Sequence, residues 1–136
     1  MPDGDEIARR ILGFSTWAVV GCSPDPTRPS HGVARFLQRQ GYEVIPINPR
    51  KDEVLGLRCY ASLADVPAQA GIEVVDVFRR SDQAGAHVDE AIAVGARAVW
   101  MQLGVVDEAA AERGRAAGLD VVMNRCPAIE HPRLVG

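Results

Sequence analysis

One pattern recurs along this chain and restricts what it can fold into: a glycine, two further residues, and then a short apolar run. It begins at Gly41, Gly71, Gly95 and Gly118, in the sequences GYEVIPI, GIEVVDVF, GARAVWM and GLDVVMN. A fifth apolar run, WAVVG, starts at Trp17. Runs this short and unbroken, rich in valine and isoleucine, are typical of strands buried on both faces, as in parallel sheets.

The stretches between these runs have the features of helices. Residues 30–40 carry apolar side chains at helical spacing behind Ser30, which stands in a capping position. Residues 81–94 and 107–117 show similar patterns, and the first dozen residues predict a further helix. Glycines 41, 95 and 118 each follow a helix where a left-handed C-terminal cap is expected. The alternation of strand and helix predicts an α/β fold with right-handed crossovers.

Two segments fit this pattern less well. Residues 57–70, LRCYASLADVPAQA, predict a short edge strand near Arg58–Tyr60 and one helical turn near Leu63–Val66. Pro46 lies within a predicted strand although proline cannot donate to a sheet ladder, so we expect it near the strand's end.

The chain of 136 residues shows no linker, which predicts a single domain over residues 1–136.

Composition excludes several classes of function. The net charge of -3 does not indicate binding to nucleic acid or to an anionic membrane. No apolar run approaches the ~20 residues of a membrane helix, and the acidic first ten residues are not a secretory signal. The three cysteines have no paired spacing and are read as reduced thiols, which predicts a cytoplasmic protein. No spacing of metal ligands and no catalytic set of side chains is found, so neither a metal nor a catalytic residue is predicted.

A ligand of such a sheet is expected at the carboxyl ends of the strands, where the strand order reverses. The segments that follow the five runs contain Gly21, Cys22, Ser23 and Pro24; Asn48, Pro49, Arg50 and Lys51; Arg79, Arg80 and Ser81; Gln102, Leu103 and Gly104; and Asn124, Arg125 and Cys126. Many of these residues are basic, and Arg28 lies in the first of the loops. The start of the helix at Ser30 adds backbone N–H groups that favour an anion. Gly21 is expected where a ligand approaches the backbone closely.

The first loop departs from the usual dinucleotide-binding fingerprint. It lacks the second and third glycines, and the second run ends in Asn48 followed by Pro49, Arg50 and Lys51 rather than in an acid. A basic pair there favours a ligand with a phosphate near the adenosine ribose. NADP carries such a phosphate on its 2′-oxygen and coenzyme A on its 3′-oxygen, and this pattern leaves both ligands open.

Four segments carry a family resemblance: VVGCSPDPTRPSHGVARFLQRQGYEVIPINP, VVDVFRRSD, AVWMQLGVV and DVVMNRCPAIEH. Together they resemble the small stand-alone CoA-binding proteins, whose domain is similar to the N-terminal domain of the succinyl-CoA synthetase α subunit. The resemblance runs from about Thr16 to Leu134. It implies a Rossmann-like, doubly wound fold: a mainly parallel sheet of five to six strands with helices on both faces, and a strand order of 3-2-1-4-5-6 or close to it.

The resemblance also implies a ligand, coenzyme A or an acyl-CoA, and a way of holding it. The loop Gly21–Pro24 would lie against the diphosphate or the pantetheine, and Asn48–Lys51 would approach the adenosine and its phosphate. Phe78 and Arg79 would line the adenine side, and Gln102 would lie near the inner end of the cleft.

The resemblance covers only the CoA-binding domain of the synthetases and does not extend to their second domain, which carries a phosphorylated histidine. A binding, carrier or regulatory module without catalysis of its own is therefore the leading hypothesis, and acting with a separate catalytic partner is one such role. The alternatives are a small NADP-dependent oxidoreductase and a domain with a decayed site that binds other proteins. The sequence leaves the oligomeric state and the acyl group open.

Overall fold

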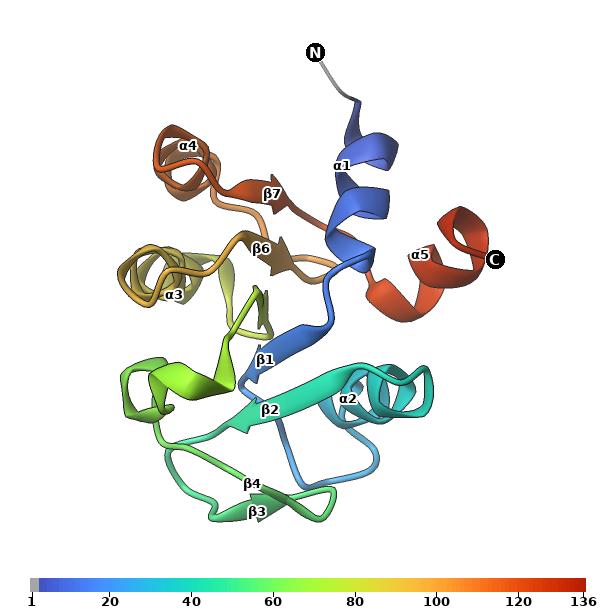
Figure 1. Ribbon diagram of the computed structural model, residues 1–136, viewed down its shortest axis with the longest axis vertical. Coiled ribbons are helices and arrows are strands. Elements are labelled where there is room, and N and C mark those ends of the chain that lie inside the picture. The colour runs from blue at the N-terminus through green and yellow to red at the C-terminus, as the bar shows by residue number, and fades with distance from the viewer. Residues whose placement is uncertain (1–2) are drawn as a thin grey trace.

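In the computed structural model, which describes residues 3–136, five parallel strands form one sheet with helices on both faces (Figure 1). The strand order is β2-β1-β5-β6-β7. The strands are β1 Thr16–Val20, β2 Glu43–Ile47, β5 Val74–Val77, β6 Ala98–Met101 and β7 Asp120–Val122. Each of them lies in one of the apolar runs, so the Rossmann-like α/β fold is confirmed.

Three helices cover one face of this sheet and two cover the other (Figure 1). The first face carries α1 Gly4–Leu12, α2 Pro29–Arg39 and α5 Pro127–Leu134. The second carries α3 Ser81–Ala93 and α4 Glu108–Ala116, together with the 3-10 turn η1 Leu63–Asp65; a second turn, η2, spans Ala68–Ala70. Gly41, Gly95 and Gly118 have φ values of 93°, 77° and 92°, as predicted for residues that follow helix ends.

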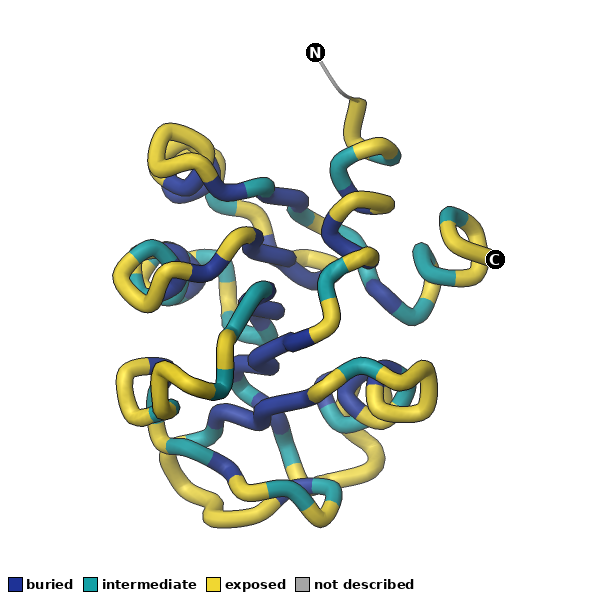
Figure 2. Tube along the Cα trace, viewed as in Figure 1, coloured by how far each residue is buried: buried dark blue, intermediate teal, exposed yellow. Residues whose placement is uncertain are grey.

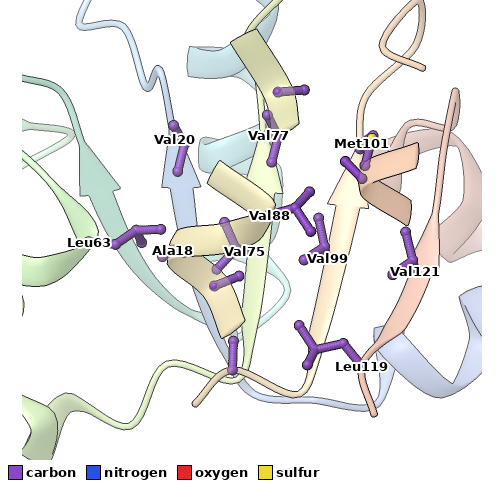
Figure 3. Close-up of a cluster of buried hydrophobic side chains, with 14 of the residues drawn as sticks. Ala18, Val20, Leu63, Val75, Val77, Val88, Val99, Met101, Leu119 and Val121 are labelled. Atoms are coloured by element: carbon purple, nitrogen blue, oxygen red, sulfur yellow. The ribbon is translucent and has the colours of Figure 1, made fainter. Parts of the chain in front are cut away.

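The strands of the sheet are largely buried (Figure 2). Side chains of alternate residues belong to two separate cores, one on each face of the sheet. Val75, Val77 and Val99 pack with Val88 of α3 on one face (Figure 3). Trp17 and Trp100 lie in the other core, with ring centroids 5.7 Å apart. Burial on both faces is what the unbroken apolar runs predict.

The sheet differs from the implied order 3-2-1-4-5-6 because it lacks a strand outside β2. The segment after β2 pairs with itself instead, as an antiparallel hairpin of β3 Glu53–Val54 and β4 Leu57–Arg58. Leu55 and Gly56, with φ of 55° and 72°, form its turn. An edge strand was predicted near Arg58–Tyr60. Arg58 belongs to the hairpin, and Tyr60 forms a single bridge with Ile47 of β2. The helical turn predicted near Leu63–Val66 is confirmed by η1.

Pro46 lies where the sequence leads us to expect it, as the penultimate residue of β2. Since β2 is an edge strand, only one side of it needs to donate to the ladder. The Ile47 carbonyl accepts from Gly21 on the inner side, whereas the Pro46 carbonyl accepts from the Tyr60 N–H at 3.1 Å on the outer side. The missing N–H of Pro46 therefore falls on the outer edge.

An acid lies in the middle of the sheet. Asp76 of β5 is fully buried and pairs in register with Val19 and Trp100. Neither of its carboxyl oxygens has a hydrogen-bond partner among residues 3–136. Burial raises the pKa of Asp76 well above its usual value, because a charge there would lose its hydration.

Candidate functional site: a basic cleft at the carboxyl ends of the strands

A cleft of about 990 Å³ runs along the carboxyl ends of the parallel strands. Each of the five strands contributes residues from the loop that follows it, which is the location expected for a ligand of this sheet type. The lining residues are Gly21, Ser23, Pro24, Asp25, Arg28, Pro29, Ser30, Val33, Asn48, Pro49, Arg50, Lys51, Phe78, Arg79, Arg80, Gln102, Leu103, Gly104, Val105 and Cys126.

The loops after β1 and β2 are held together by hydrogen bonds from side chains. Asn48 Nδ2 donates to the Cys22 carbonyl at 3.0 Å, and Asn48 Oδ1 accepts from the Arg50 N–H at 2.9 Å. Asn48 therefore positions the loop that carries Arg50 and Lys51.

Ser30 holds the first loop rather than capping its helix, so the capping prediction is wrong. The N-cap of α2 is Arg28, one residue before Pro29, and Ser30 lies in the first turn. The Ser30 Oγ accepts from the Ser23 N–H at 3.0 Å, which ties the loop to the start of the helix.

Gly21 is required for packing within the protein. Its φ is +81°, and a Cβ there would lie 2.6 Å from the Phe78 carbonyl oxygen. The close approach is thus between the loops after β1 and β5, so the structure gives Gly21 a different reason from the ligand contact expected from the sequence. A larger residue would strain the backbone and separate these loops.

The lining of the cleft is strongly basic, although the chain as a whole is acidic. Among the described residues, its charged side chains are Arg28, Arg50, Lys51, Arg79 and Arg80 against a single acid, Asp25. The Asp25 carboxylate accepts from the N–H and hydroxyl of Thr27, which lowers its pKa and keeps it charged. The Arg79 Nε is buried and has no partner within residues 3–136. An anionic ligand would satisfy this arrangement.

Most residues that the sequence placed at the carboxyl ends of the strands line the cleft, and the exceptions are Cys22, Ser81, Asn124 and Arg125. Cys22 is fully buried beneath the first loop, and burial, with Cys59 and Asp76 nearby, raises the pKa of its thiol to about 12. It is therefore neither exposed to a ligand nor a reactive thiolate at neutral pH.

Arg125 does not join the basic cluster, and the expectation that it converges on the cleft is wrong. Its Nη1 donates to Asp5 of α1 at 2.8 Å and lies 3.7 Å from Glu130 of α5. Arg125 thus fastens α1 to α5, because two acids from those helices capture its guanidinium.

Four lining residues were not selected from the sequence: Asp25, Pro29, Val33 and Val105. Leu103, Gly104 and Cys126 belong to the strand-ending segments that the sequence had placed at this edge. Val33 lines the cleft from α2, and its place among the helically spaced apolar residues was the sequence feature that could have indicated it. Asp76 was also missed, although an acid inside the apolar run VVDVF is unusual.

The described residues do not suggest a metal centre or a membrane span. Within residues 3–136 no group of three His, Cys, Asp or Glu side chains is placed to hold a metal ion. None of the described helices is long and apolar enough to cross a membrane.

The fold and the cleft together define a Rossmann-like protein with a basic site at the carboxyl edge of its sheet. Residues 15–132 match the family model described as a CoA binding domain, and the chain belongs to this family.

Relatives of two kinds share this domain. The uncharacterized protein YneT of Bacillus subtilis is 40% identical over 130 residues, which are 96% of this chain and 95% of YneT. A hypothetical protein from Pyrococcus horikoshii superposes with a TM-score of 0.91 at 41% identity, covering 98% of this chain and 94% of that one. A dinucleotide-forming acetyl-coenzyme A synthetase of Ca. Korarchaeum cryptofilum has a TM-score of 0.73 at 28% identity, with 84% of this chain matching 26% of the synthetase.

Proposed function

We propose that this protein binds coenzyme A or an acyl-CoA in the basic cleft and acts as a binding, carrier or regulatory module without catalysis of its own. The observation that supports this most directly is the convergence of five basic side chains on the carboxyl edge of a CoA-binding-family fold. Coenzyme A carries a ribose phosphate and a diphosphate, which are the charges that such a lining favours.

The arrangement of the cleft suggests an orientation for the ligand. Arg50 and Lys51 lie at the β2 end, where they would face the ribose phosphate. The loop after β1 and the start of α2 would lie against the diphosphate, at the positive end of the helix dipole and next to Arg28. The pantetheine arm would then extend over β5 and β6 toward Gln102.

A thermal-shift panel tests the proposal. We expect CoA and acetyl-CoA to stabilise the protein, by about 2.7 kcal/mol at a hundred times the dissociation constant, and NAD and ATP to have little effect. A shift selective for NADP would instead support the small oxidoreductase. No shift with any of these ligands would contradict the proposal and favour a protein-interaction role.

Replacing Arg79 by alanine should weaken CoA binding about tenfold at low salt. Its buried Nε has no partner in the described chain, so a ligand acceptor would gain a charge-assisted hydrogen bond. Calorimetry at two salt concentrations should show a shallower salt dependence in the variant, since one ionic contact is lost.

Arg80→Ala is the matched control for this experiment. Arg80 is largely exposed and lies 3.5 Å from Asp82, so its removal should change affinity much less. Equal losses in the two variants would mean that only the total charge of the cleft matters.

A further inference from the structure

The third cysteine, Cys126, lies at the opposite end of the cleft from the basic pair Arg50 and Lys51. It follows β7, which is the far edge of the sheet from β2. Four strand spacings of ~4.8 Å separate these edges by roughly 19 Å. A ligand that is anchored by a phosphate at β2 and spans the cleft would therefore present its other end near Cys126.

The backbone around Cys126 is held firmly in this position. Asn124, with φ of 57°, turns the chain after β7, and its Oδ1 accepts from the Gly104 N–H at 2.7 Å. The Arg125 N–H donates to the Met101 carbonyl at 3.3 Å, and the Arg125 carbonyl accepts from Trp100 Nε1 at 2.8 Å. These bonds fasten the segment to the end of β6, beside the loop that carries Gln102.

Of the three thiols, that of Cys126 is the accessible one. Cys22 and Cys59 are buried, whereas Cys126 is partly exposed and lines the cleft. Cys126 is the N-cap residue of α5, but its side chain does not cap the helix. Cys126 packs partly against the core beneath it, and its sulfur is not engaged in a capping hydrogen bond.

Gln102 gives a second, independent indication of a ligand at this end. Gln102 is 5% exposed and lines the cleft, yet its Oε1 is buried and has no hydrogen-bond partner within the described chain. A buried amide oxygen without a donor is costly, and a ligand amide N–H would satisfy it. The pantetheine arm of coenzyme A carries such amides next to its thiol.

We infer that Cys126 forms a disulfide with the thiol of coenzyme A bound in this cleft. The inference rests on the proposed CoA site and adds a regulatory property to it, because it makes the protein sensitive to the redox state of coenzyme A. The reaction needs only the disulfide of coenzyme A as oxidant. The Cys126 thiolate attacks one sulfur of that disulfide, and the S–S bond of the reagent breaks. A Cys126–CoA disulfide forms while the second CoA leaves as a thiolate, which takes up the proton that Cys126 released.

Intact mass spectrometry of the reduced protein after exposure to CoA disulfide tests the inference. We expect the mass to increase by one CoA less two hydrogens, and peptide mapping of the unvaried protein to place the adduct on Cys126. The reaction should be at least tenfold faster than with glutathione disulfide at the same concentration, because binding in the cleft aligns the two sulfurs. Acetyl-CoA should slow it by occupying the cleft, and dithiothreitol should reverse it.

Two variants and one binding measurement complete the design. Cys126→Ser should lose the adduct, and Cys59→Ser, which changes a buried thiol outside the cleft lining, should retain it. An adduct on another cysteine, or equal rates with the two disulfides, would overturn the inference. Calorimetry of acetyl-CoA with the unvaried protein separates the proposed CoA site from the inferred disulfide. If acetyl-CoA binds but CoA disulfide gives no adduct, only the disulfide is contradicted. If acetyl-CoA does not bind, the proposed function is contradicted.

Discussion

Coenzyme A is expected to bind this protein about tenfold to a hundredfold more tightly than dephospho-CoA, which lacks only the 3′-phosphate. Arg50 and Lys51 line the cleft just after β2, and Asn48 fixes the turn that presents them. A hydrogen bond to a charged group contributes about 1.5–3 kcal/mol, which corresponds to roughly a tenfold to hundredfold difference in affinity. Both side chains are exposed, so solvent screening favours the lower end of the range.

The double variant Arg50→Ala, Lys51→Ala should lose most of this preference and bind dephospho-CoA nearly as before. Calorimetry of both ligands with both proteins completes a thermodynamic cycle that isolates the contact. The double variant Arg35→Ala, Arg39→Ala removes the same charge from the exposed surface of α2 and should keep the preference. If the unvaried protein binds the two ligands equally, the basic turn after β2 is only a solvated surface.

Replacing Asp76 by asparagine should change how stability depends on pH. The pKa of Asp76 in the folded protein is raised by burial, so the unfolded chain ionises first as pH increases. The stability associated with its protonated form is complete below the unfolded pKa, near 4, and is lost as pH rises toward the folded pKa. In that window the unvaried protein should lose about 1.4 kcal/mol of unfolding free energy per pH unit from this group, and Asp76→Asn should not.

Urea unfolding of both proteins over a pH series at constant ionic strength measures this difference. Over two pH units inside this window, the difference in unfolding free energy between the unvaried protein and Asp76→Asn should change by ~2.7 kcal/mol. Burying the asparagine amide costs the variant the same free energy at every pH, so it does not affect the slope of unfolding free energy against pH. Asp82→Asn, which changes an exposed acid, should leave the slope unchanged. Parallel curves for Asp76→Asn and the unvaried protein would mean that Asp76 is ionised in the folded state.

Local features of the sequence determined most of the architecture. The four apolar runs that follow glycines and the fifth at Trp17 predicted the five strands, because a strand buried on both faces needs no polar alternation. The rule that ligands bind at the carboxyl ends of parallel strands then selected most of the cleft lining, from Gly21 to Gln102, since strand ends can be read from a sequence. The family resemblance added the ligand class, which the basic turn at Arg50 had left open between two cofactors.

Tertiary structure decided where the remaining side chains point. Arg125 and Cys126 are neighbours in sequence, yet the arginine is captured by Asp5 and Glu130 while the cysteine lines the cleft. Ser30 became a loop anchor because the Ser23 N–H reaches its hydroxyl, and Asp76 lost its hydration because two helical layers enclose the sheet. The contact between Arg125 and Asp5 joins groups that are distant in sequence and meet only after folding, so no local pattern could have specified it.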